Sequence, residues 1–111
     1  MSRRHSATHA REHAIASDAS SGDAILARVR RLRARGDVRK ALVMLREACM
    51  RDESAAVLWT IYGALQAKLG HVEDARRALK QAVWLRRSAG DAKRARSTQA
   101  LLDGVSIPSA A

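Results

Sequence analysis

The sequence is poor in aromatic side chains and in residues that interrupt helices. Aromatics make up 3% of its 111 residues, phenylalanine is absent, and Pro108 is the only proline. A core with so few aromatics must be built mainly from Ala, Leu and Val, which suits closely packed helices better than strands. Because no proline precedes the C-terminal end, nothing interrupts helices over most of the chain. The sequence therefore predicts an all-α fold.

Cysteine is also scarce, since Cys49 stands alone. A single cysteine excludes an internal disulfide and the zinc sites made of four cysteines, and it suits a reducing compartment. Its apolar neighbours Ala48 and Met50 favour a buried structural cysteine over a catalytic thiol. No apolar run reaches the ~18 residues of a membrane span, and no apolar segment follows Arg3 and Arg4 as a secretory signal requires. We expect a cytoplasmic protein with no membrane partner.

Acidic residues are few relative to basic ones. The chain has 21 Lys and Arg against 11 Asp and Glu, a net charge of +10. Residues 1–22 carry only +1 of this charge, whereas residues 23–104 hold 18 basic and 9 acidic side chains. The basic charge therefore belongs to the part that folds. A basic domain of this kind suits an acidic protein partner or the phosphate backbone of a nucleic acid.

The two ends of the chain differ in composition from its middle. Small polar residues close an N-terminal stretch, and a glycine and Pro108 follow the last apolar pattern. We expect disordered tails at 1–22 and 105–111 around one helical domain at 23–104. The N-terminal tail carries His5, His9 and His13 at a spacing that could bind a metal if it were helical. No apolar face orders this tail, so incidental histidines are favoured, and no metal or cofactor is expected.

Five helical segments follow from the spacing of apolar residues. The first ends before Gly36, and the second and third lie on either side of a loop at 51–54. The fourth runs over 72–85, and a turn at 88–91 leads into the fifth. The third segment, which ends at Leu69, is apolar around much of its circumference. We therefore expect it to lie between neighbouring helices.

One pattern occurs twice at a fixed interval, which is the separation of Gly36 and Gly70 in the sequence. We call this separation the repeat interval. A constant interval of this length is typical of repeat proteins, in which each helical pair buries its apolar face by stacking on the next. Gly104 follows Gly70 at the same interval, and we expect all three glycines to adopt the left-handed conformation that ends the first helix of a pair. The recurring positions are Gly36, Val38, Ala41, Leu45 and Ala48, followed by Gly70, Val72, Ala75, Leu79 and Ala82.

These residues resemble the tetratricopeptide repeat (TPR), a helix–turn–helix unit of about 34 residues. The better copy covers residues 56–89, and the weaker covers 22–55. In the better copy, Gln66 replaces the usual tyrosine and Arg87 the usual final proline. The resemblance implies a TPR-like α-solenoid fragment of five antiparallel helices, with two helical hairpins and a capping helix. The residues that match the family are Trp59, Gly63, Gly70, Ala75, Leu79 and Ala82, with the turn sequence HVEDA at 71–75.

The resemblance also implies a function. Members of this family bind peptide segments of other proteins along a concave face, which the first helix of each pair lines. Here that face is basic and rich in small residues, so the resemblance implies an acidic or mixed peptide as ligand. With two repeats against a usual minimum of about three, we also expect a partner or self-association to extend the stack. The implied lining residues are Leu26, Arg30, Arg33, Thr60, Ala64, Ala67, Lys68, Arg94 and Thr98.

The first segment carries a dense cluster of five arginines. They could contact nucleic-acid phosphates, bind an acidic partner segment, or form a solvated outer face, and the sequence leaves these alternatives open. No glycine-rich phosphate loop, nucleophile elbow or metal-binding helix motif occurs, so no enzyme activity is expected. The five arginines are Arg28, Arg30, Arg31, Arg33 and Arg35.

Overall fold

The computed structural model describes residues 22–105, and all regular structure in this range is helical. The all-α class with five helices is thus confirmed for these residues. The expected tails, apart from their inner ends, and the His5, His9 and His13 run lie outside the described range. None of the described helices combines the length and the apolarity needed to cross a membrane. The helices are residues 22–34, α2 (Val38–Arg51), α3 (Ala56–Lys68), α4 (Val72–Ser88) and α5 (Ala92–Gly104).

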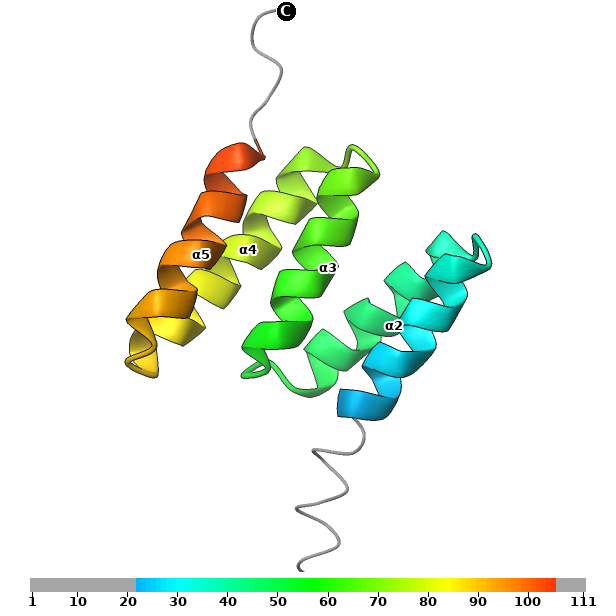
Figure 1. Ribbon diagram of the computed structural model, residues 1–111, viewed down its shortest axis with the longest axis horizontal. Helices are drawn as coiled ribbons and strands as arrows, with labels where there is room; N and C mark the ends of the chain where they lie inside the picture. The colour runs from blue at the N-terminus through cyan, green and yellow to red at the C-terminus, as the bar shows by residue number, and fades with distance from the viewer. Residues whose placement is uncertain (1–21, 106–111) are drawn as a thin grey trace, which may run out of the picture.

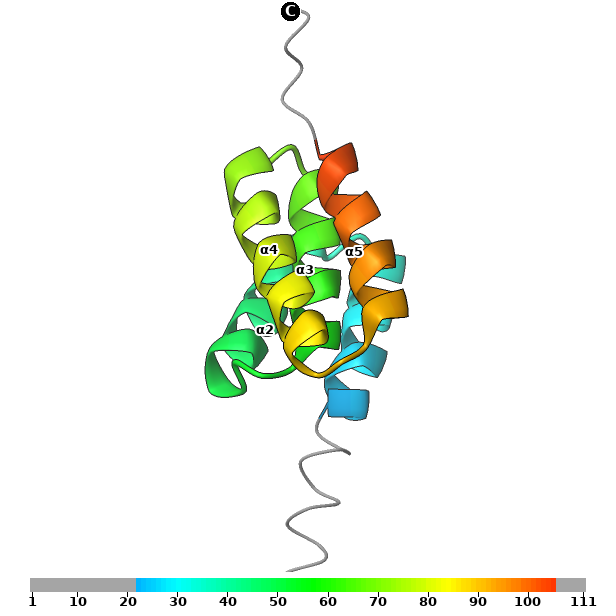
Figure 2. The same ribbon diagram turned by 90° about the vertical axis from the view of Figure 1, so that its left-hand side faces the viewer.

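Consecutive helices run antiparallel, and α3 lies between α2 and α4 (Figure 1). The helix at 22–34 lies beside α2 at one edge of the array, and α5 packs on α4 at the other edge (Figures 1 and 2). The predicted position of the third helix between neighbours is therefore confirmed. Its largely apolar circumference is explained by packing on both sides.

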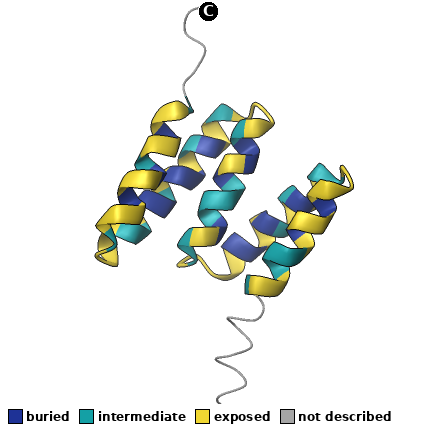
Figure 3. Ribbon diagram, viewed as in Figure 1, coloured by how far each residue is buried: buried dark blue, intermediate teal, exposed yellow. Residues whose placement is uncertain are grey.

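The repeat interval recurs in the positions at which helices begin and end. The first helix ends at residue 34 and α3 at Lys68, while α2 begins at Val38 and α4 at Val72. Buried positions lie on the sides where helices meet (Figure 3). The repeated small and apolar residues thus form the buried contacts of each helical pair. Ala41, Leu45 and Ala48, and their counterparts Ala75, Leu79 and Ala82, are all at most 3% exposed.

The turns after the first helix and after α3 share one geometry. Gly36 and Gly70 have φ angles of 84° and 83°. The N–H of Gly36 donates to the carbonyl of Arg33 (3.0 Å), and the N–H of Asp37 donates to that of Leu32 (2.8 Å). These two bonds form a Schellman motif, which satisfies carbonyls at the helix end and needs a left-handed residue. Glycine adopts that conformation without steric cost.

The ends of α4 and α5 correct two predictions. Gly104 is the last residue of α5 and lacks a positive φ, whereas Gly90, with φ 77°, forms the left-handed turn between α4 and α5. The fourth helix also runs to Ser88 instead of ending at residue 85. Arg87 permits the longer helix, because a proline at this position would have stopped it. As a result α5 begins at Ala92, slightly later than the repeat interval counted from Ala56 would place it.

A polar group is buried between α3 and the turn that follows it. The side chain of Gln66 is 4% exposed, and its amide N–H donates to the Tyr62 hydroxyl at 3.1 Å. The Gln66 oxygen pairs with Nδ1 of His71. Buried polar groups are costly unless they are hydrogen-bonded, and both ends of this amide are. The buried glutamine is therefore accommodated at this position.

Candidate functional site

A cleft with positive charge lies between the C-terminal ends of the first helix and α3. Its volume is about 570 Å³. Leu65 in its lining is 2% exposed and Leu69 is 40% exposed, which gives the cleft an apolar floor. No acidic residue lines it. We call it the cationic cleft, and its residues are Arg30, Arg33, Ala34, Val38, Leu65, Lys68 and Leu69.

The three cations of this cleft form no ion pair with any described residue. The ion pairs in the described part of the chain are Arg35–Asp37 (3.4 Å), Arg77–Asp74 (3.9 Å) and Arg94–Asp91 (3.4 Å). Lys68 lies in the last turn of α3, and Arg33 lies in the last turn of the first helix. A cation in the last turn also stabilises the helix by interacting with the helix dipole. Arg30 lies about a turn earlier, so the dipole does not account for it.

A second cleft, of about 380 Å³, lies at the N-terminal ends of the same two helices. Leu26 of the first helix and Val57 of α3 line it, and Val57 is 50% exposed. Leu26, Arg30 and Arg33 are spaced by four and three residues, so they share one face of the first helix. Both clefts therefore follow the same face. The other residues of this N-terminal cleft include Asp23, Asp52, Leu58, Leu85, Arg86, Asp91 and Arg94.

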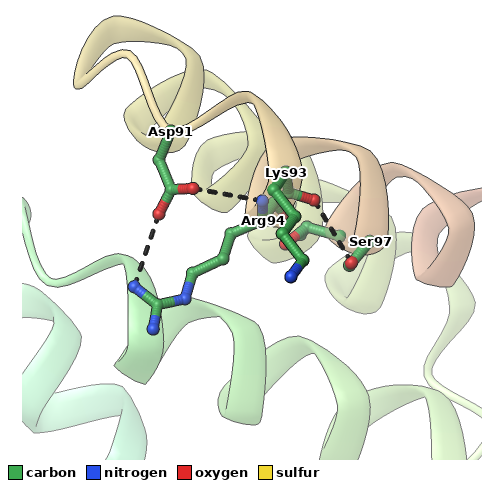
Figure 4. A network of polar contacts seen from close by, with 5 residues as sticks. Asp91, Lys93, Arg94 and Ser97 are labelled. Atoms are coloured by element: carbon green, nitrogen blue, oxygen red, sulfur yellow. Dashed lines mark hydrogen bonds and ion pairs between the residues drawn. The ribbon is translucent and has the colours of Figure 1, made fainter.

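The charge of Arg94 is partly neutralised within α5. Asp91 caps the helix by accepting the Arg94 backbone N–H at 3.2 Å, and it also pairs with the Arg94 guanidinium at 3.4 Å (Figure 4). The Ser97 hydroxyl donates to the Lys93 carbonyl at 3.2 Å in the next turn. With its three aspartates the N-terminal cleft is therefore less positive than the cationic cleft.

The structure brings together some of the residues predicted as partner-binding and separates others. Arg30, Arg33 and Lys68 line the cationic cleft, and Leu26 and Arg94 line the N-terminal cleft. The sequence reasoning missed Val38, Leu65 and Leu69, which form the apolar part of the cationic cleft. Leu65 lies in the last turn of α3 and Leu69 follows the helix as its C-cap, four residues later. This spacing was the available signal.

The remaining predicted residues belong to α3 and α5. Ala64 is exposed, and Thr60 and Ala67 are half-buried. The Thr60 hydroxyl donates to the Ala56 carbonyl at 2.7 Å, within its own helix. Thr98 is 2% exposed and its hydroxyl donates to the Arg94 carbonyl at 2.7 Å. Thr98 is therefore part of the packed interior and does not line an exposed face.

A further cleft is lined by residues of α2, α3 and α4. Its volume is about 730 Å³. Exposed apolar residues of α2, Val43 and Met50, lie on its edge at 54% and 58% exposure. The sequence pattern predicted no site here. This outer cleft carries charges of both signs, from Arg46, Glu53, Asp74 and Arg77.

Cys49 is fully buried in α2, so its predicted burial is confirmed. Burial, and secondarily the Asp52 carboxylate, raises the pKa of its thiol from the usual 9.0 to about 12. Since the thiolate is the nucleophile, a thiol that stays protonated is poorly reactive. Within residues 22–105, no three His, Cys, Asp or Glu side chains are grouped so that they could hold a metal ion.

No protein-family model, curated protein or solved structure matches this chain.

Proposed function

We propose that this chain is a non-enzymatic protein–protein interaction module, which binds an acidic segment of a partner protein along the face shared by the first helix and α3. The cationic cleft carries the proposal. Arg30, Arg33 and Lys68 surround the apolar floor of Leu65 and Leu69, and no acid lies among them. An amphipathic segment would pair its carboxylates with the cations and cover the floor with an apolar side chain.

The strength of such binding follows from the exposure of the site. Arg30, Arg33 and Lys68 are exposed, so each ion pair with a partner carboxylate contributes about 0.2–1 kcal/mol. An arginine can pair with both oxygens of a carboxylate, which favours Arg30 and Arg33 as the orienting contacts. We therefore expect weak binding that falls as salt is added, with the apolar floor supplying the salt-independent part.

We also propose that the chain is a small TPR-like protein. The equal interval between the ends of the first helix and α3, 34 to 68, and between the starts of α2 and α4, 38 to 72, supports this proposal, as does the burial of the repeated alanines and leucines. In that family the first helix of each pair lines the binding face, which is where the cationic cleft lies. A partner or a second copy would extend the short stack. The single free cysteine, Cys49, supports a cytoplasmic location.

The experiment is a titration of the full chain into a fluorescein-labelled amphipathic peptide of alternating Glu and Leu, followed by anisotropy. Arg30→Gln/Arg33→Gln should weaken binding about tenfold, because two charge-assisted contacts are lost. The matched control, Arg28→Gln/Arg31→Gln, removes the same charge from the other side of the same helix and should leave affinity within about twofold. Equal losses of affinity in the two double variants would contradict specific binding in the cationic cleft.

A second peptide tests the apolar floor. Replacing every Leu of the probe by Ala keeps its charge but removes the side chains that would cover Leu65 and Leu69. Affinity should fall, and the remaining binding should be more sensitive to salt. Equal affinity for the two peptides would show that the chain attracts acidic peptides by charge alone.

A further inference from the structure

The first helix carries a second group of arginines that faces away from the cationic cleft. Arg28 and Arg31 lie three residues apart in the helix, and Arg35 follows directly after its last residue, with its N–H still donating to the Arg31 carbonyl at 3.1 Å. The spacings of three and four residues therefore place the three side chains on one side. Arg30 and Arg33, by contrast, line the cationic cleft. Arg28, Arg31 and Arg35 are all exposed. We call these three residues the outward arginine face.

The residues beside these arginines argue against a protein interface and against a membrane surface. Ala24 and Ala27 are their neighbours on this side, and no large apolar side chain of the first helix accompanies them. Protein interfaces need an apolar core that loses its water on binding, and membrane-surface helices need residues such as Trp, Phe or Leu. The outward arginine face offers neither. Cations among small residues instead suit phosphate oxygens, which arginine binds through parallel N–H donors.

The charges on this side are poorly balanced within the described residues. Arg35 pairs with Asp37, but Arg28 and Arg31 have no ion-pair partner there, and Asp23 is the only acid of the helix. Like charges three and four residues apart destabilise a helix by about 0.2–0.5 kcal/mol per pair. A bound polyanion would remove this repulsion.

The start of α2 adds to the imbalance. Arg39 and Lys40 are exposed in its first turn, which holds no acidic residue. Cations are unfavourable at the N-terminal end of a helix, because the helix dipole is positive there. They follow Arg35 closely across the Gly36 turn. The concentration of cations therefore extends beyond the first helix at this edge of the molecule.

We propose that the outward arginine face binds the phosphate backbone of a nucleic acid without reading its bases. Arg28 and Arg35 are two helical turns apart, which is about 10 Å along a helix, and this length spans about three nucleotides of one strand. The helix at 22–34 has no Asn or Gln side chain to read adenine and no aromatic side chain to stack on a base. The proposal is independent of peptide binding, because the two arginine groups lie on different sides of one helix.

The experiment measures the anisotropy of a short fluorescein-labelled random-sequence duplex as the full chain is added at several salt concentrations. Arg28→Gln/Arg31→Gln should reduce the slope of log affinity against log salt by about 2, and should lower affinity at low salt at least about tenfold. Arg30→Gln/Arg33→Gln is the matched control, with an expected loss of about threefold or less. Circular dichroism checks that both variants remain helical.

Three results would overturn the proposal. The first is an absence of saturable duplex binding at about 20 mM salt, where electrostatic binding is strongest. The second is a loss from the Arg30 and Arg33 pair that equals or exceeds the loss from the Arg28 and Arg31 pair. The third is that polyglutamate competes as well as unlabelled duplex at equal charge, because a general attraction of polyanions would then explain the binding. Each result leaves the peptide titration unaffected, so the two proposals can fail separately.

Discussion

Gly63 of α3 lies directly against Leu79 of α4. A Cβ atom at Gly63 would lie 2.8 Å from Cγ of Leu79 and 3.2 Å from the Ala75 carbonyl oxygen. Leu79 is fully buried, so its side chain has no free space to move into. The close approach of α3 and α4 therefore depends on the absence of a side chain at Gly63. This glycine sets the distance between the two helices of the second pair.

We expect Gly63→Ala to lower the free energy of unfolding by about 1–2 kcal/mol, because overpacking a filled core costs more than alanine gains in a helix. Overpacking costs about 1–3 kcal/mol, whereas replacing glycine by alanine within a helix gains up to about 1 kcal/mol. Urea unfolding followed by circular dichroism measures the difference. Gly104→Ala is the control, since no atom lies within 4 Å of the added Cβ there. Unchanged stability of Gly63→Ala would mean that Leu79 repacks freely.

The glycines of the turns provide a second prediction. Gly70→Ala and Gly90→Ala should each destabilise the fold by about 1–2 kcal/mol, because both residues have positive φ angles that alanine adopts with strain. Gly104→Ala should be neutral or slightly stabilising. Thermal unfolding of the three variants gives the comparison. If Gly104→Ala were as damaging as Gly70→Ala, the regular glycine series would describe the turns better than the structure does.

A third prediction concerns Cys49. Burial raises its pKa to about 12, so the folded state holds the thiol proton over a pH range in which the unfolded chain, with a pKa near 9.0, releases it. The stability that this proton contributes is fully present below pH 9.0 and is lost as the pH rises toward about 12. Urea unfolding should therefore show a steeper loss above pH 9.0 for the native chain than for Cys49→Ala.

The same burial predicts slow thiol chemistry at neutral pH. A thiol reagent should modify Cys49 much more slowly in the folded chain than in urea, because the reagent needs both access and a thiolate. Equal rates in the two states would contradict the buried position of this side chain.

A fourth prediction tests the repulsion within the outward arginine face. Arg31→Glu places an acid three residues after Arg28 and four before Arg35, so two repulsive pairs become attractive ones. We expect the free energy of unfolding to rise by about 0.5–1 kcal/mol at low salt, and the gain to shrink at about 1 M salt. Arg31→Lys, which keeps the charge, is the control and should change little. A gain that persists at high salt would point to packing instead of charge.

Much of the fold followed from local patterns along the chain. The spacing of Val29 and Leu32, and of Ala41, Leu45 and Ala48, predicts helices whose buried side is already defined, and these residues are buried. Helical periodicity needs only neighbouring residues, so it can be recognised without knowing what the helix packs against. The left-handed conformation predicted for Gly104 was wrong, because α5 continues through that residue, whereas the predicted turn at 88–91 is present and its Gly90 is left-handed.

The candidate site could be predicted only in part. Arg30, Arg33 and Lys68 were among the expected residues, but their common cleft with Leu65 and Leu69 depends on the distance between two helices that the whole of α2 separates in the sequence. Thr98 was expected to line the face, yet it is 2% exposed, in a helix whose main contacts are with α4. Such contacts are not encoded by any local pattern.

The sequence by itself determined that this chain forms paired helices with a net positive charge, because helix propensity, apolar spacing and composition are local properties. Only the tertiary structure decided what surrounds the two groups of arginines that helical spacing already separates on the first helix. The packing of the first helix against α2 and α3 fixes its rotation, and this rotation turns Arg30 and Arg33 toward the cationic cleft while Arg28, Arg31 and Arg35 face solvent.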